Sequence, residues 1–170
     1  LVQFSSKINS FIVPKSKPSQ LNVLLKQLDD NNTGQDTNIG VVIHEMAERI
    51  RKRGLVILIS DLLDDPKEII NGLKHFRHMN QEVIVFHILD RKEIDFNFNS
   101  RTKFLDMESG EEIITEPWLI KSDYVNIIKD SQNFYKKQCN EFSIDYIPVQ
   151  TDMELNHSIR KYLNKRKKLN

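Results

Sequence analysis

The sequence predicts an α/β fold, with a doubly wound, mostly parallel sheet and helices on both faces. Two apolar runs, residues 55–59 and 83–89, have the length and β-branched content of strands buried on both faces, as parallel sheets require. A third core strand is expected at residues 144–149. Helical periodicity separates these strands, and such alternation is typical of a parallel sheet with crossover helices. No repeat or low-complexity linker interrupts the 170 residues, which predicts a single domain over residues 1–170.

The N-terminal part of the chain is expected to form a hairpin followed by two amphipathic helices. Residues 1–4 and 10–13 have the composition of short strands, joined by the turn sequence SSKIN. Leucines spaced at i, i+3, i+4 and i+7 then predict a helix through residues 21–28. Six apolar residues at helical spacing predict a second helix along residues 39–50.

The part after the second core strand predicts a small β insertion and two further helices. Residues 94–98 alternate apolar and polar side chains, and residues 104–114 alternate around a Ser-Gly turn, so we expect a small antiparallel excursion. Pro117 is expected to open a long helix, with Trp118 anchoring its start in the core. The alternative for Trp118 is an exposed contact residue for a partner protein. A capping box at residues 151–154 predicts the last helix.

Composition and motifs give no support to several classes of function. Net charge is +1, so no strong electrostatic field favours nucleic acid or an anionic membrane, and no nucleic-acid partner is expected. The one cysteine, Cys139, excludes an intrachain disulfide framework and is read as a packed thiol. No apolar run reaches membrane-spanning length and no signal peptide opens the chain. The sequence has no P-loop, G-x-G-x-x-G or G-x-S-x-G motif, which argues against nucleotide binding and a nucleophile elbow.

The most informative stretch is RGLVILISDLLDD, residues 53–65, where an apolar strand runs directly into Asp61, Asp64 and Asp65. In open α/β sheets, ligands bind at the carboxyl ends of the strands. Asp65 precedes a proline and is most simply an N-cap of the following helix. Asp61 is harder to explain as a cap, because a carboxylate against a buried strand end needs a partner.

A second polar loop, GQDTN at residues 34–38, precedes a helix and offers Asp36, Thr37 and Asn38. Thr37 or Asn38 could simply cap that helix. If the loop meets Asp61 at one rim of the sheet, the hydroxyl and carboxylate oxygens are the hard ligands that magnesium prefers. Both readings stay open at this point.

The histidines suggest no metal site by spacing alone. His75 and His78 lie at i and i+3 of one helix, and we read them as solvated basic surface because structural zinc takes four ligands. His87 lies inside an apolar strand and is read as a hydrogen-bonded core histidine.

Several segments together resemble one bacterial family, the domain of unknown function 58. These segments, in chain order, are FSSKI, GQDTN, RGLVILISDLLDD, EVIVFHILD, FLDMESGEE and FSIDYIPVQTD. Its members are von Willebrand factor A-like (vWA-like) proteins encoded beside MoxR-type AAA+ ATPases. The resemblance implies a vWA fold with a metal-ion-dependent adhesion site, built from a D-x-S-x-S motif, a threonine and a later aspartate. Thr37 matches the threonine and Asp61 the aspartate, whereas D-x-S-x-S is absent, so magnesium binding is expected to be weak or lacking.

The resemblance also implies that the first central strand of the fold is missing. The chain is expected to be an N-terminally truncated vWA-like domain that starts at the second strand of the family. The missing strand would lie between residues 1–4 and residues 55–59, and its loss would leave two edges with unpaired backbone groups. We therefore expect a rearranged sheet edge or a homodimer formed through the exposed edge.

The function implied is that of a non-catalytic interaction or adaptor domain. It would work with a MoxR-type AAA+ ATPase in chaperone-like assembly or maturation of client complexes, with Asp36, Asn38 and Asp64 on the interaction rim. The expected location is the bacterial cytoplasm, or the membrane through a region outside this chain. An alternative is a magnesium-dependent phosphoryl hydrolase using Asp61, Asp64 and Asp65, although no nucleophile or base is evident for it. A third is a purely structural oligomerisation domain.

Overall fold

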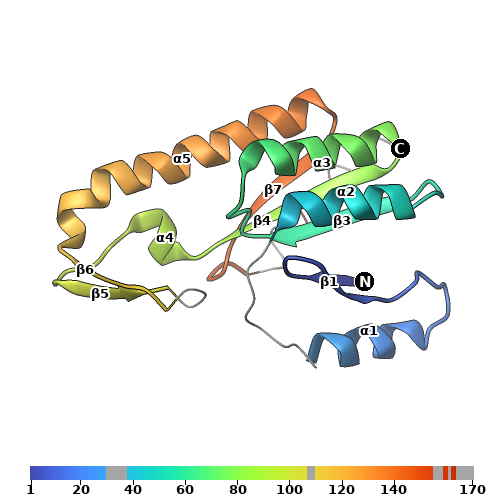
Figure 1. Ribbon diagram of the computed structural model, residues 1–170, viewed down its shortest axis with the longest axis horizontal. Coiled ribbons are helices and arrows are strands. Elements are labelled where there is room, and N and C mark those ends of the chain that lie inside the picture. The colour runs from blue at the N-terminus through green and yellow to red at the C-terminus, as the bar shows by residue number, and fades with distance from the viewer. Residues whose placement is uncertain (30–37, 107–109, 155–158, 161, 164–170) are drawn as a thin grey trace.

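Three parallel strands form the centre of the protein (Figure 1). The computed structural model describes residues 1–29, 38–106, 110–154, 159–160 and 162–163. The central sheet has the order β3-β4-β7, with β3 at Leu55–Ser60, β4 at Glu82–Leu89 and β7 at Asp145–Gln150. Two antiparallel hairpins accompany it, β1 (Val2–Phe4) with β2 (Ile8–Phe11) and β5 (Thr102–Leu105) with β6 (Glu112–Thr115). The expected α/β class with a mostly parallel, helix-flanked sheet is confirmed.

Within the part of the chain that the structure describes up to Glu154, five helices connect and cover these strands. They are α1 (Gln20–Asp29), α2 (Ile39–Arg49), α3 (Pro66–His78), α4 (Arg91–Asp95) and α5 (Pro117–Glu141). One hydrophobic core joins α2, α3 and α5 to β3 and β4, with Ala47, Ile69, Leu73, Val85 and Tyr135 completely buried. None of the described helices is both long and apolar enough to cross a bilayer.

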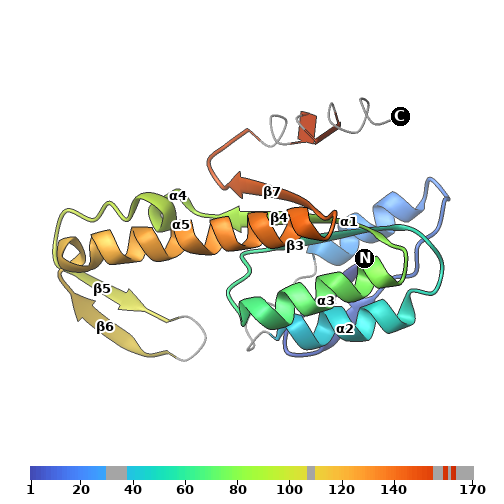
Figure 2. The same cartoon turned by 90° about the horizontal axis from the view of Figure 1, so that it is seen from above.

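Helices α2 and α3 run side by side in both views (Figures 1 and 2) and approach closely because a glycine lies on each. A Cβ atom added to Gly72 would lie 2.6 Å from Ile43 Cγ2, and one added to Gly40 would lie 2.7 Å from Glu68 Cβ. Real Cβ contacts do not reach such distances. The two helices can therefore lie this close only because Gly40 and Gly72 have no side chain.

The two faces of the central sheet differ at β3. Strands β3 and β4 pair in parallel with Leu58 opposite Val85, and both of these side chains point into the core. On the opposite face Leu55, Ile57 and Ile59 are 43%, 50% and 66% exposed. Ile84, the neighbour of Ile57 on β4, is only 2% exposed. The exposed apolar side chains on this face therefore lie on β3, whereas Ile84 on the neighbouring strand is covered.

The β1–β2 hairpin does not join the central sheet. Among the described residues β1 pairs with β2 alone and β3 with β4 alone. The hairpin is attached through Val2, Phe4 and Ile8, which pack against the core, and through Gln3, which accepts a 2.9 Å hydrogen bond from the side chain of Gln27 on α1. Among the described strands the sheet is therefore interrupted between β1 and β3, and the expected pairing with a second copy of the chain stays a prediction.

Two segments differ from the sequence-based expectation, and a third is described only in part. Residues 94–98 are not a strand, because Asp90 and Glu93 form a capping box that starts α4 in this region. Trp118 does not anchor α5 in the core, since it is 51% exposed and the preceding Pro117 is buried instead. The expected last helix is described only at residues 159–160 and 162–163, which are helical.

Candidate functional site

The loop after β3 and the start of α2 meet at the carboxyl end of the central sheet. Asp64 Oδ2 accepts a 2.7 Å hydrogen bond from the backbone N–H of Ile39, the first residue of α2. Asp64 Oδ1 accepts a second 2.7 Å hydrogen bond from the N–H of Asp65. Both carboxylate oxygens are thus engaged by backbone donors. The Asp64 side chain joins two loops that are 25 positions apart in the chain.

Of the residues predicted on the loop before α2, only Asn38 belongs to the described part of the chain. Asp36 and Thr37 lie outside the described residues. Asn38 is the N-cap of α2, and its side-chain oxygen accepts a 3.1 Å hydrogen bond from Val41 N–H. For Asn38 the simple capping interpretation is therefore the one that the contacts support.

The other two aspartates of the stretch also bind nearby backbone groups. Asp65 is the N-cap of α3, with Oδ1 accepting from the N–H groups of Lys67 at 2.8 Å and Glu68 at 3.4 Å, which confirms its predicted role. Asp61 is exposed, and its Oδ1 accepts a 3.3 Å hydrogen bond from Leu63 N–H. Local turn formation therefore accounts for the carboxylate at the strand end.

The acidic cluster does not form a metal cage in the part of the chain that the structure describes. No group of three or more His, Cys, Asp or Glu side chains there is arranged to hold a metal ion. Backbone N–H groups bind one oxygen of Asp61, one of Asp65 and both of Asp64. The hydrolase alternative built on these three residues stays a prediction.

The apolar pair inside DLLDD explains the shape of this loop. Leu62 has a left-handed backbone with φ of 57°, which costs a non-glycine residue about 1–2 kcal/mol. Its side chain is buried, and its carbonyl accepts a 3.3 Å hydrogen bond from the Tyr135 hydroxyl. Leu63 faces solvent. Burial of Leu62 thus offsets the strain of the tight turn that brings Asp64 toward α2.

His87 connects the same loop to the core. It is 3% exposed, and Nε2 lies 2.8 Å from the backbone carbonyl of Asp61, so Nε2 must carry the proton and donate. Nδ1 then accepts from the Tyr146 hydroxyl at 2.7 Å. Burial lowers the pKa of His87 and raises the pKa of Tyr146, so both groups stay neutral. The prediction of a hydrogen-bonded core histidine is confirmed.

The end of β4 is built in a similar way. Asp90 caps α4 by accepting from Lys92 N–H at 2.8 Å, and its other oxygen accepts from the Thr151 hydroxyl at 2.8 Å. These two hydrogen bonds, the backbone one first, lower the pKa of Asp90. The Arg91 guanidinium binds Asp152 at 2.9 Å, which adds a second link between the loops after β4 and β7. Capping and loop-to-loop contacts again account for the charged side chains.

One polar contact was missed by sequence reasoning. His44 on α2 lies against His75 on α3, with a separation of 3.2 Å between the two Nδ1 atoms. The i, i+3 spacing in the sequence pairs His75 with His78 on the same helix instead. Nothing local in the sequence marks the contact, because it depends on how α2 packs on α3.

Comparison with protein-family models gives one match. Residues 1–133 match the model described as protein of unknown function DUF58. The comparisons with curated proteins and with solved structures gave no significant match. The matched region begins with the β1–β2 hairpin, includes the loop after β3, and ends within α5. Because the match covers well over half of the sequence, the chain belongs to the DUF58 family of proteins of unknown function.

Proposed function

We propose that this chain is a non-catalytic protein-interaction domain that accepts one extended strand of a partner protein along β3. The observation that carries the proposal is the outer edge of β3, which pairs with no strand in the part of the chain that the structure describes. Its Leu55, Ile57 and Ile59 side chains are all about half exposed or more. An unpaired strand edge offers a row of backbone N–H and C=O groups to an added strand.

The composition of β3 supports an edge that is meant to be covered. Exposed edge strands are normally protected by charged residues, proline or bulges. The β3 sequence LVILIS contains none of the protective residue types, and its pairing with β4 shows no bulge. Alternating apolar side chains on the exposed face would give pockets for the alternate side chains of an incoming strand.

Charge defines the partner further. The basic residues 51–53 precede β3, and the acidic residues Asp61, Asp64 and Asp65 follow it. A matching strand would be apolar in the middle, acidic at the end beside residues 51–53 and basic at the end beside Asp61. Such complementarity sets orientation and register more than affinity.

A single strand fits this edge better than a second copy of the central sheet. The β1–β2 hairpin lies on the β3 side of the sheet, as Figures 1 and 2 show, so an approaching second sheet would meet the hairpin. The hairpin also has an edge of its own, since β1 pairs only with β2 among the described residues.

Strand addition along β3 is the mode of binding that we propose for the adaptor role. The partner implied by the resemblance is a MoxR-type AAA+ ATPase, acting with this domain on an unknown client, and we carry it forward as the proposed partner. Strand addition needs no metal ion, so this role does not depend on magnesium binding by Thr37 and Asp61.

The test uses short fluorescent peptides of alternating valine and threonine, with lysines at one end and aspartates at the other, in both charge orders. We expect the full chain to bind one order saturably in fluorescence anisotropy. A peptide with a central proline should not bind, because proline removes the N–H and breaks the pairing. Ile57→Lys on β3 should abolish binding, whereas Ile113→Lys on β6, where the isoleucine is also exposed, should leave it unchanged.

Two results would overturn the proposal. Equal binding of the proline peptide would show that the contact is not strand pairing. A chain that is dimeric in sedimentation and becomes monomeric with Ile57→Lys, but not with Ile113→Lys, would show that a second copy occupies the edge.

A further inference from the structure

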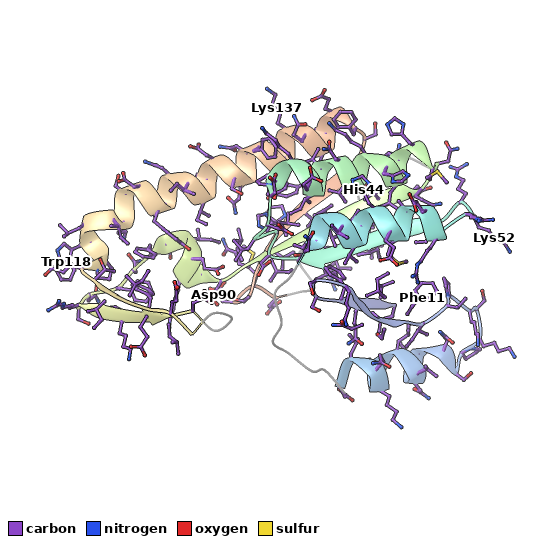
Figure 3. The ribbon with its side chains drawn as sticks, viewed as in Figure 1. Phe11, His44, Lys52, Asp90, Trp118 and Lys137 are labelled. Carbon is purple, nitrogen blue, oxygen red and sulfur yellow. The ribbon has the colours of Figure 1, made fainter. Side chains whose placement is uncertain are left out.

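The contact between His44 and His75 joins two helices through their ring nitrogens. The Nδ1 atoms are 3.2 Å apart, and the ring centroids are 5.4 Å apart with an angle of 47° between the planes. His44 comes from α2 and His75 from α3, 31 positions apart in the chain. Figure 3 shows His44 on α2, on the side of the helix that faces α3. Both rings are partly exposed, so the pair is accessible to solutes.

The two rings are held in place by the close packing already described. His44 follows Gly40 by four positions on α2, and His75 follows Gly72 by three positions on α3. These spacings place each histidine on the same helix face as its glycine, one turn further along. Because the glycines fix how closely the helices approach, the two imidazoles are brought together by rigid elements and not by mobile loops.

We propose that His44 and His75 bind a divalent transition-metal ion, with Zn²⁺ as the reference ion, through their Nδ1 atoms. Zinc–nitrogen bonds to histidine are about 2.0–2.1 Å long. Two such bonds whose nitrogens are 3.2 Å apart enclose an angle of about 100° at the metal. This angle lies between the octahedral and tetrahedral values, so the separation of the two nitrogens suits a single bound ion. Imidazole nitrogen is a good ligand for Zn²⁺, Ni²⁺ and Cu²⁺.

The remaining coordination positions are open. Glu48 lies four positions after His44, and His78 lies three positions after His75, so both are on the faces that flank the pair. Neither completes a group of three ligands as the described side chains stand. An ion held by the two histidines would complete its coordination with water or with a ligand from outside the chain, so we expect weaker binding than at zinc sites with three or four protein ligands.

The competing explanation is a hydrogen bond between two neutral rings. In that case one Nδ1 carries a proton and donates it to the other. Metal binding requires both Nδ1 atoms to be unprotonated, with the protons on Nε2. The two states differ in ¹⁵N shifts of the ring nitrogens, so NMR of the chain with and without zinc distinguishes them.

The experiment is calorimetric titration of ZnCl₂ into the full chain and three single variants. His44→Gln and His75→Gln each remove one ligand, and His78→Gln is the matched control on the same helix. We expect one saturable site in the unchanged chain and in His78→Gln. Affinity should fall by about tenfold or more in the other two variants, as for loss of groups that support a metal site. Thermal unfolding without metal should show that all four proteins are folded.

The inference fails if the unchanged chain binds no zinc, or if either His44→Gln or His75→Gln binds as tightly as the control. It would also fail if zinc saturates a site without changing the ¹⁵N shifts of His44 and His75. The site does not depend on strand addition at β3, so peptide binding and zinc binding succeed or fail separately.

Discussion

Replacing Gly72 with alanine tests how α2 and α3 pack. The new Cβ would lie 2.6 Å from Ile43 Cγ2 and 2.9 Å from Ile43 Cβ, and Ile43 is buried and cannot swing aside. Overpacking of this kind costs about 1–3 kcal/mol. Alanine gains up to about 1 kcal/mol over glycine inside a helix, which offsets part of the cost. We therefore expect Gly72→Ala to lower the free energy of unfolding by about 1–2 kcal/mol.

Thermal unfolding followed by circular dichroism measures this change. For a chain of this size, 1 kcal/mol corresponds to about 2–4 °C in Tm, so a loss of 1–2 kcal/mol should lower Tm by roughly 2–8 °C. Gly54→Ala is the control, because its Cβ would approach nothing closer than 3.5 Å, and its Tm should hardly change. Ile43→Leu removes the branch at Cγ2, so adding it to Gly72→Ala should recover about 1 kcal/mol in a double-mutant cycle. A Gly72→Ala chain as stable as the unchanged one would refute the close approach of the helices.

Three further predictions concern the loop after β3 and its link to the core. Burial lowers the pKa of His87, so between pH 7 and pH 5 the unfolded chain binds a proton at this histidine more readily than the folded chain does. The free energy of unfolding measured in urea should therefore fall as the pH falls. The fall should be less steep in His87→Gln. Asp64→Ala removes the acceptor for the N–H groups of Ile39 and Asp65 and should cost about 1–3 kcal/mol, whereas Asp64→Asn should cost less because one acceptor oxygen remains. Asp65→Ala removes the N-cap of α3 and should cost about 1 kcal/mol by thermal unfolding, and no change would contradict the capping role.

Local patterns predicted most of the central fold. The apolar runs at β3 and β4, the cap at Asp65 and the leucine spacing of α1 are short-range features, and each corresponds to an element of the structure. Residues 94–98 were wrongly predicted as a strand because period-2 alternation outweighed the Asp90–Glu93 capping box a few positions earlier. An alternation of only five residues is weak evidence for a strand, and a capping box just before it favours a helix.

The candidate sites were harder to predict because they depend on tertiary packing. The contact of Asp64 with Ile39 could be anticipated, since both follow from the rule that loops meet at the carboxyl ends of parallel strands. The pairing of His44 with His75 could not, because it requires the separation and rotation of two helices. Thr37, on which the adhesion-type interpretation rests, lies outside the described residues, so that part of the site stays a prediction.

Helix α5 gives the molecule a long reach. Its 25 residues span about 37 Å, and Tyr135 and Cys139, the side chains that enter the core, both lie in its C-terminal half. At its other end it follows the β5–β6 hairpin, well away from the central sheet (Figure 1). The hairpin packs there through the stacked rings of Phe96, Phe104 and Tyr124. Because Tyr124 lies far along α5 from Tyr135 and Cys139, this end of the molecule has a small aromatic cluster of its own.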